Sequence, residues 1–260
     1  MGQVFGQAAN SAAQQVMTRS VGTVMASPTV ASTTRSLCGS DTWGVCHNMT
    51  AQVLTGFSEE FVRRMTQEDV RMAANAREQA IDSGKTQTWS NAQSGASGTV
   101  VSQPAAPRPP APVKIAAQPG VVGTPPELEA VGEPYVVKGG KPINVRGGPG
   151  TTFDVVGSLA PNERIKALAK VKASDWYLVG RGDVAIGYVS GSLMQRADLF
   201  APPAQAPVPQ PTTPPANVEQ VNVTMSAECY TTTQTVRLGD GTSQEAKVTS
   251  CRTPNGWAQV

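Results

Sequence analysis

Between residues 66 and 84, apolar side chains recur at the spacing of a single helical face. This face consists of Val70, Ala73, Ala74, Ala80 and Ile81. Thr66 is a good N-cap residue, and Glu68 and Asp69 place negative charge in the first turn, where it complements the helix dipole. Gly84 readily adopts the left-handed conformation that ends a helix. The pattern therefore predicts a helix that begins after Thr66 and ends before Gly84.

Two stretches on either side of the chain's middle show strand patterns with turn residues between them. Residues 86–101 contain Trp89 and a turn rich in Ser, Asn and Gly, which predicts two short strands. In residues 229–251, β-branched and polar residues flank Gly239-Asp240-Gly241, and Asp-Gly is a hairpin signal. A hairpin centred on Asp240 places Cys229 directly opposite Cys251. The two sulfurs then lie on one face, at the separation that a cross-strand disulfide requires.

The middle of the chain, about 134–197, alternates in short β-like segments separated by turns such as Gly147-Gly148-Pro149-Gly150. Short strands at such regular intervals are typical of a small barrel. Proline-rich tracts flank this block, with nine prolines in residues 104–134 and seven in residues 202–215. These tracts predict extended, polyproline-like spacers, and ligands for a proline-binding partner are the alternative.

These patterns divide the chain into six parts. One helix and two short strands cannot bury a stable core alone, and neither can one hairpin. We therefore expect the two to join into one α+β unit with a helix on one sheet face. The fold class is mainly β with α+β: a small barrel inserted by Pro-rich linkers into a split helix-plus-antiparallel-sheet domain. The predicted parts are an N-terminal segment that depends on a partner (1–58), the first half of the α+β unit (59–103), a linker (104–133), the barrel (134–197), a second linker (198–222) and the second half, a β-hairpin (223–260).

Composition excludes several classes of function. The 260-residue chain is 39% hydrophobic and 15% charged with a net charge of +2, so a strongly basic nucleic-acid binder is excluded. It has a single histidine, His47, which excludes sites that need two imidazoles. Cys46 precedes His47, and neighbouring side chains on a strand point to opposite faces, which argues against a catalytic dyad. We expect no enzyme activity, no metal and no cofactor.

The four cysteines fall into two pairs, Cys38/Cys46 and Cys229/Cys251. Two disulfides favour an oxidising compartment outside the cytoplasm. Four unrelated thiols are one alternative, and a zinc site is another, although neither pair has the C-x2-C spacing. The first ten residues lack the basic and apolar regions of a signal peptide. Either the chain has been trimmed, its start lies upstream, or the inference of export is wrong; we favour the first two.

The flanking halves resemble the 17-kDa type of outer-membrane surface antigen. The matching residues are the helix Val70 to Gly84, then Trp89-Ser90-Asn91 with Ser94-Gly95-Ala-Ser-Gly98-Thr-Val, and later Cys229-Tyr230 and Cys251-Arg252-Thr-Pro-Asn-Gly256-Trp257. The resemblance implies a periplasmic protein, with association to the outer membrane left open. Trp89 and Trp257 are then expected to be structural, packing the split domain.

The middle block resembles a bacterial SH3 domain. The matching segments are Asn144-Val-Arg146-Gly-Gly-Pro-Gly150, Phe153-Asp-Val-Val-Gly157, Leu159-Ala-Pro-Asn-Glu163, Asp175-Trp176-Tyr177-Leu-Val179 and Gly187-Tyr188-Val-Ser-Gly-Ser-Leu193. The resemblance implies an SH3-like barrel that binds peptidoglycan or other envelope proteins. Arg146, Tyr177 and Tyr188 are the candidate ligand-binding residues, although Arg146 could equally hold the Gly-Gly-Pro turn. Trp176 is expected in the core.

Three hypotheses follow. The first is a non-catalytic envelope-binding or scaffold protein whose barrel holds peptidoglycan or a protein partner. The second is a structural subunit of a larger outer-membrane or periplasmic assembly. The third, a cell-wall hydrolase, is the least favoured because the required nucleophile–base or metal constellation is missing.

Overall fold

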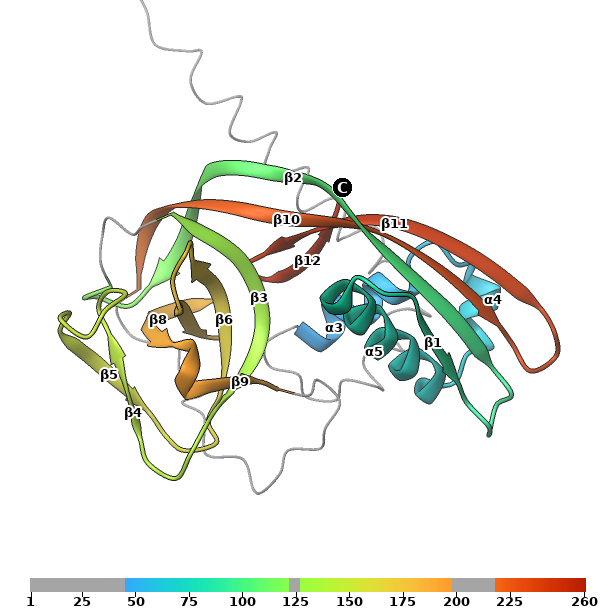
Figure 1. Ribbon diagram of the computed structural model, residues 1–260, viewed down its shortest axis with the longest axis horizontal. Helices are drawn as coiled ribbons and strands as arrows, with labels where there is room; N and C mark the ends of the chain where they lie inside the picture. Colours follow the sequence, from blue (N-terminus) through green and yellow to red (C-terminus); the bar gives the residue numbers. More distant parts are fainter. Residues whose placement is uncertain (1–44, 122–126, 198–217) are drawn as a thin grey trace, which may run out of the picture.

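The computed structural model describes residues 45–121, 127–197 and 218–260, and side chains from residue 50 onward. This part of the chain is mainly β, as expected (Figure 1). Its helices are α3 (Val45–Leu54), α4 (Glu59–Arg63) and α5 (Gln67–Ser83). Its strands are β1 (Gln87–Ser90), β2 (Ser97–Ala117), β3 (Leu128–Val137), β4 (Ile143–Arg146), β5 (Val155–Leu159), β6 (Arg164–Val171), β7 (Trp176–Arg181), β8 (Val184–Ser190), β9 (Met194–Arg196), β10 (Glu219–Arg237), β11 (Ser243–Thr253) and β12 (Gly256–Gln259). Among the described residues, no helix combines the length and hydrophobicity of a membrane span.

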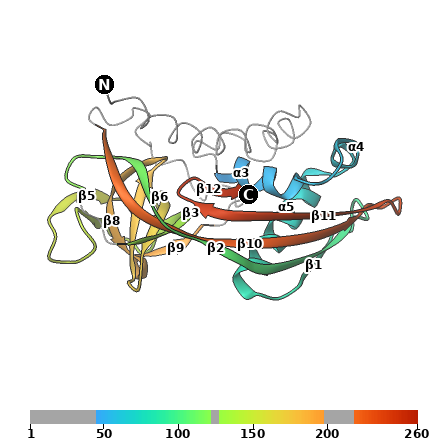
Figure 2. The same ribbon diagram turned by 90° about the horizontal axis from the view of Figure 1, so that it is seen from above.

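One mixed sheet contains all twelve strands, and its main path runs β1-β2-β10-β3-β6-β7-β8-β4-β5. Strand β11 lies beside β10, β12 beside β11, and β9 beside β3. The long strands β2 and β10 pair antiparallel and form what we call the ribbon. Figures 1 and 2 show the ribbon running from the barrel to the helices. We call residues 97–103 and 229–237 its helix end, and residues 111–117 and 219–227 its barrel end.

Local signals at the helix end predicted the structure correctly. The Thr66 hydroxyl accepts a hydrogen bond from the Asp69 backbone N–H, and the Asp69 carboxylate accepts one from the Thr66 N–H at 2.8 Å. This capping box opens α5, and Gly84, with φ +63°, ends it. The predicted apolar face is buried, and most of it forms one core with Val100 and Val236 of the ribbon. The strands predicted around the Ser/Asn/Gly turn are β1 and the start of β2.

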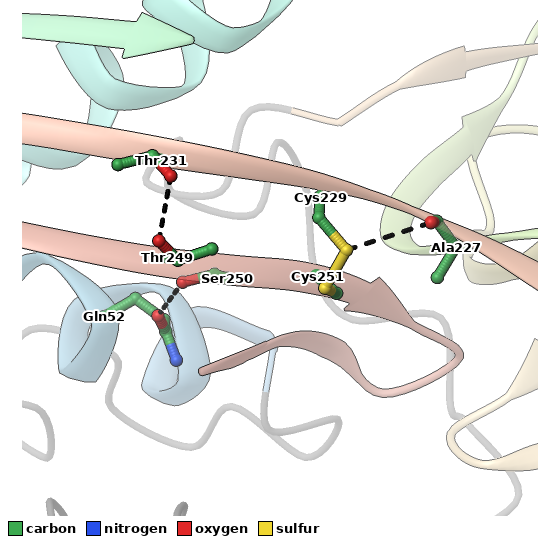
Figure 3. The surroundings of a disulfide bond; sticks show 7 residues. All are labelled: Gln52, Ala227, Cys229, Thr231, Thr249, Ser250 and Cys251. Atoms are coloured by element: carbon green, nitrogen blue, oxygen red, sulfur yellow. Dashed lines mark hydrogen bonds between the residues drawn. A yellow bond between two sulfur atoms is a disulfide. The ribbon is translucent and has the colours of Figure 1, made fainter. Parts of the chain in front are cut away.

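The C-terminal hairpin has the register predicted from its turn. Cys229 pairs with Cys251 and Arg237 with Ser243, so the hairpin is centred on Asp240. A disulfide joins Cys229 to Cys251, with their Cα atoms 4.0 Å apart, which confirms this pairing (Figure 3). The other predicted pair, Cys38 with Cys46, lies outside the residues whose side chains are described.

The prediction of a free linker over 104–133 is wrong. Residues 104–117 belong to β2, and residues 128–133 belong to β3. The pairing of β2 with β10 shifts its register at two bulges in β2. At one bulge Ala106 and Pro107 lie opposite the single position 228 of β10, and at the other Pro109 and Pro110 lie opposite position 226. Proline has no N–H for a ladder and is therefore confined to bulges and open edges in sheets. The tract is thus a bulged strand and not a polyproline spacer.

The barrel also extends beyond its predicted limits of 134–197. Strand β3 starts at Leu128, six residues before the predicted limit. The ribbon also closes a ring with β3, β6, β7 and β8. At one side of this ring β10 pairs with β3 at Met225 and Ser226, and at the other side β2 pairs with β8 at Ala116 and Ala117. Strands β3, β6, β7 and β8 belong both to this ring and to the barrel, so a core covers each of their two faces. One core is formed by Val137, Ile143, Val145, Leu159, Ile165, Val179, Ile186, Val189 and Met194. The second core lies under the ribbon and includes Ile115, Ala117, Leu128, Leu168, Leu178, Tyr188, Val223 and Met225.

The ribbon buries opposite faces at its two ends. In β10 the buried positions are Val223 and Met225 at the barrel end, a face that Cys229 at the start of the helix end still shares, but Thr232, Gln234 and Val236 beyond the disulfide. These two sets differ by an odd number of residues, and successive side chains of a strand point to opposite faces.

The N-terminal segment 1–58 is described only from residue 45, and the second linker, 198–222, only in its last five residues, of which 219–222 belong to β10.

Candidate functional site

Two tyrosines from different strands meet on the barrel and form its best candidate binding surface. Tyr135 of β3 and Tyr177 of β7 are both partly buried, with ring centroids 5.6 Å apart and planes inclined by 45°. They pack against the core that contains Ile165 and Val179. Lys170 of β6 is partly exposed, and its Nζ lies 5.9 Å from the centroid of the Tyr177 ring, within cation–π range.

A tight turn also approaches the Tyr177 ring. A Cβ atom on Gly191 would lie 2.7 Å from Tyr177 Cε2, so the backbone approaches the ring as closely as only glycine allows. The exposed Asp175 holds this turn. Its carboxylate accepts hydrogen bonds from the Ser190 hydroxyl at 3.1 Å and from the Ser192 backbone N–H at 3.0 Å.

The chemistry of this surface suits binding. Burial raises the pKa of the Tyr135 phenol far above its usual value, and the neighbouring Tyr177 and Glu133 raise it further. The phenol therefore stays protonated and can donate a hydrogen bond. Two partly exposed rings beside an ammonium group can take an apolar or sugar face on the rings and an anionic or carbonyl group at Lys170.

The three predicted ligand-binding residues do not come together. Tyr188 pairs with Leu178 on the face under the ribbon, whereas Tyr177 points to the other face. Tyr188 is 0% exposed, and burial raises the pKa of its phenol to about 12. A ligand cannot reach it, so its assignment as a binding residue is wrong. The resemblance carried no information on what the ribbon would cover.

Arg146 takes the alternative role that we considered. Its guanidinium donates a hydrogen bond to the Phe153 carbonyl oxygen at 2.7 Å and so closes the turn after β4. The Phe153 ring lies against Gly148, where a Cβ atom would come within 2.3 Å of it. This contact gives the Gly-Gly-Pro-Gly sequence a structural reason.

Two of the three tryptophans in the described residues, Trp89 and Trp257, lie in packed regions. Trp89 is 9% exposed and belongs to the helix-end core, and Trp257 is 2% exposed. Trp257 stacks with two guanidinium groups, those of Arg77 at 5.0 Å and Arg252 at 4.4 Å from its ring centroid. Trp176 is only partly buried and packs at the margin of the core under the ribbon.

A charge cluster that the sequence did not predict joins the barrel to α5. Arg196 of β9 forms ion pairs with Glu133 at 2.7 Å, with Glu78 at 3.2 Å and with Asp82. Arg252 of β11 pairs with the same Glu133. Burial lowers the pKa of Arg196, but the three acids outweigh it and raise the pKa overall. Each charge has opposite neighbours, so the cluster connects two parts of the fold and leaves no free charge for a ligand.

No metal-binding cluster appears among the described residues. No three His, Cys, Asp or Glu side chains are grouped there as a metal would need. Cys46 and His47 are consecutive residues of α3 and not of a strand as we assumed, and their side chains lie outside the description.

Residues 141–195 match the family model of the bacterial SH3 domain. A bacterial SH3 domain is present. The match runs from β4 into β9, so Tyr177 lies inside it, while Tyr135 of β3 lies before its first residue. No curated protein and no solved structure matches the chain. The resemblance of the flanking residues to surface antigens stays a prediction.

Proposed function

We propose that the protein is a non-catalytic binding protein of the bacterial cell envelope. Its SH3 domain would hold a ligand at the surface formed by Tyr135, Tyr177 and Lys170, and that ligand is peptidoglycan or an envelope protein. The observation that carries the proposal is the meeting of two partly exposed tyrosines and a lysine on a domain whose family consists of binding modules.

The disulfide supports a location outside the cytoplasm. Cys229 and Cys251 pair in register and are both buried, and such bonds form and persist in oxidising compartments. We place the protein in the periplasm, with association to the outer membrane suggested by the surface-antigen resemblance of the flanks.

Retention of the full chain on purified cell wall tests this function. We expect Tyr177→Leu, which removes the ring but keeps apolar volume, to weaken retention at least tenfold. Phe153→Leu is the matched control, because Phe153 is a 38% exposed aromatic residue of the same domain outside the tyrosine surface. Equal retention of the two variants would contradict the proposed surface.

A structural subunit of a larger envelope assembly is the second candidate. The middle of β2, residues 103–112, is largely exposed and belongs to neither buried core of the ribbon. A neighbouring protein that covered this stretch would explain it. If the chain fails to bind cell wall but co-purifies with membrane proteins independently of Tyr177, this second function is favoured over the first.

A further inference from the structure

The disulfide lies where the sheet forks. On one side of β10, β11 pairs from Arg237 as far as Cys229, and β3 pairs at Met225 and Ser226. Cys229–Cys251 is therefore the last β10–β11 pair before β10 passes to the barrel. Figure 3 shows the disulfide near the end of β11, where the chain turns back shortly after Cys251. The disulfide therefore fixes the position at which the β10–β11 pairing ends.

The segment directly after the disulfide contacts the barrel; we call residues 252–256 the clamp. Arg252 forms an ion pair with Glu133 of β3. The side-chain oxygen of Asn255 accepts a hydrogen bond from Lys166 Nζ of β6 at 3.3 Å. The Lys166 side chain is 1% exposed whereas Asn255 is exposed, so this contact lies where the buried lysine reaches the surface of the junction.

Backbone also packs on backbone at this junction. A Cβ atom on Gly132 of β3 would lie 2.2 Å from the Thr253 carbonyl oxygen and 2.3 Å from the Gly256 nitrogen. Gly132 has φ +69° and lies where the β3–β6 register shifts. Contact at this range tolerates little displacement of the clamp, and the clamp begins one residue after Cys251.

We propose that the Cys229–Cys251 disulfide is a covalent latch that seats the clamp on the barrel and so joins the barrel and the helix end into one rigid unit. The latch closes when two thiols form an S–S bond and pass two electrons and two protons to a disulfide-bearing protein oxidant, which becomes a dithiol. Cys229 is 3% and Cys251 1% exposed, so the closed latch is shielded from reductants in the folded protein. The inference concerns the junction alone and does not depend on which ligand the tyrosine surface binds.

Hydrogen exchange on the full oxidised chain tests the latch. In Cys229→Ala/Cys251→Ala, we expect residues 130–136 and 252–256 to exchange at least tenfold faster, with less than threefold change in α5 and in residues 231–236. The matched control is Thr231→Ala/Thr249→Ala, a cross-strand pair two residues further into the hairpin whose hydroxyls lie 2.8 Å apart (Figure 3). We expect this control to leave residues 130–136 unchanged.

A second variant keeps the test decisive if the cysteine variant unfolds throughout. Arg252→Met retains the disulfide but removes the ion pair of the clamp with Glu133, so residues 130–136 should again exchange faster while α5 does not. The proposal is overturned if a folded cysteine variant shows equal acceleration in the hairpin and the barrel. It is also overturned if Arg252→Met leaves the exchange of residues 130–136 as in the unchanged chain.

Discussion

The two ends of the ribbon are stabilised in different ways. At the barrel end, the ribbon covers an apolar core, with Val223 and Met225 of β10 facing Leu178 and Tyr188. At the helix end, the same strand buries the polar residues Thr232 and Gln234 as well as Val236. Ser102 Oγ, Thr232 Oγ1 and Gln234 Oε1 have no hydrogen-bond partner among the described residues, whereas the barrel-end core contains one such atom, Tyr188 Oη. Because an unsatisfied buried polar group costs about 1–3 kcal/mol, we expect the helix end to be the less stable one and to rely on its helix caps.

The largest expected effect is in the barrel. Leu178 is fully buried under the ribbon, so Leu178→Ala should lower the free energy of unfolding by about 2–5 kcal/mol through lost burial and a cavity. Chemical denaturation measures the loss. A loss below about 1 kcal/mol would show that the core under the ribbon is loosely packed and would remove the contrast between the two ends.

A smaller loss is expected at the helix end from Asp69. Its carboxylate accepts hydrogen bonds from the Asn91 amide at 2.7 Å and the Ser94 hydroxyl at 2.6 Å, besides capping α5. Asp69→Asn should therefore cost about 1–3 kcal/mol at neutral pH. Exchange should speed up first in α5 and β1 and leave the barrel unchanged.

The same residue makes the helix end sensitive to acid. Burial raises the pKa of Asp69, but the hydrogen bonds from Ser94, Thr66 and Asn91 outweigh it and hold the pKa below the ordinary value of 3.8. Because the pKa of Asp69 is lower in the folded than in the unfolded chain, the ionised carboxylate adds to the free energy of unfolding. This stabilisation is complete above about pH 5 and is lost as the pH falls through the folded pKa. Denaturation measured across this range should show a smaller loss for Asp69→Asn than for the unchanged chain.

The smallest effect should be a gain. Thr232→Val keeps the branched shape but removes a buried hydroxyl that has no partner, so stability should stay equal or rise by up to about 1 kcal/mol. Thermal unfolding checks the sign. A clear destabilisation would mean that the hydroxyl is satisfied in solution and that the helix end is better packed than the comparison implies.

Short-range signals in the sequence were sufficient for the helix end. Thr66, Asp69 and Gly84 act within one helix, and Asp240 centres a hairpin whose strands adjoin it, so spacing predicted both the cap and the Cys229–Cys251 pair. The barrel's SH3 identity was also readable, from turns and aromatic residues in a fixed order.

Long-range pairing was not readable. Pro109 and Pro110 look like spacer residues unless their place in bulges opposite β10 is known, and β10 lies more than 100 positions away. The same pairing hides Tyr188, which resembled a ligand-binding residue. The residues that contact Tyr177, namely Tyr135 and Lys170, come from two other strands. Nothing in the sequence around either residue indicated that it would lie beside Tyr177.

The bulged proline tract constrains how such a chain can change over generations. A flexible linker tolerates inserted or deleted residues. Strand β2, by contrast, must bury Ser102 at the helix end and Ile115 in the barrel-end core, so the number of residues between these two positions is fixed. Dropping one residue would reverse every side chain beyond the gap. Prolines in this stretch should therefore be exchangeable for other small residues across related chains, whereas its length should stay the same.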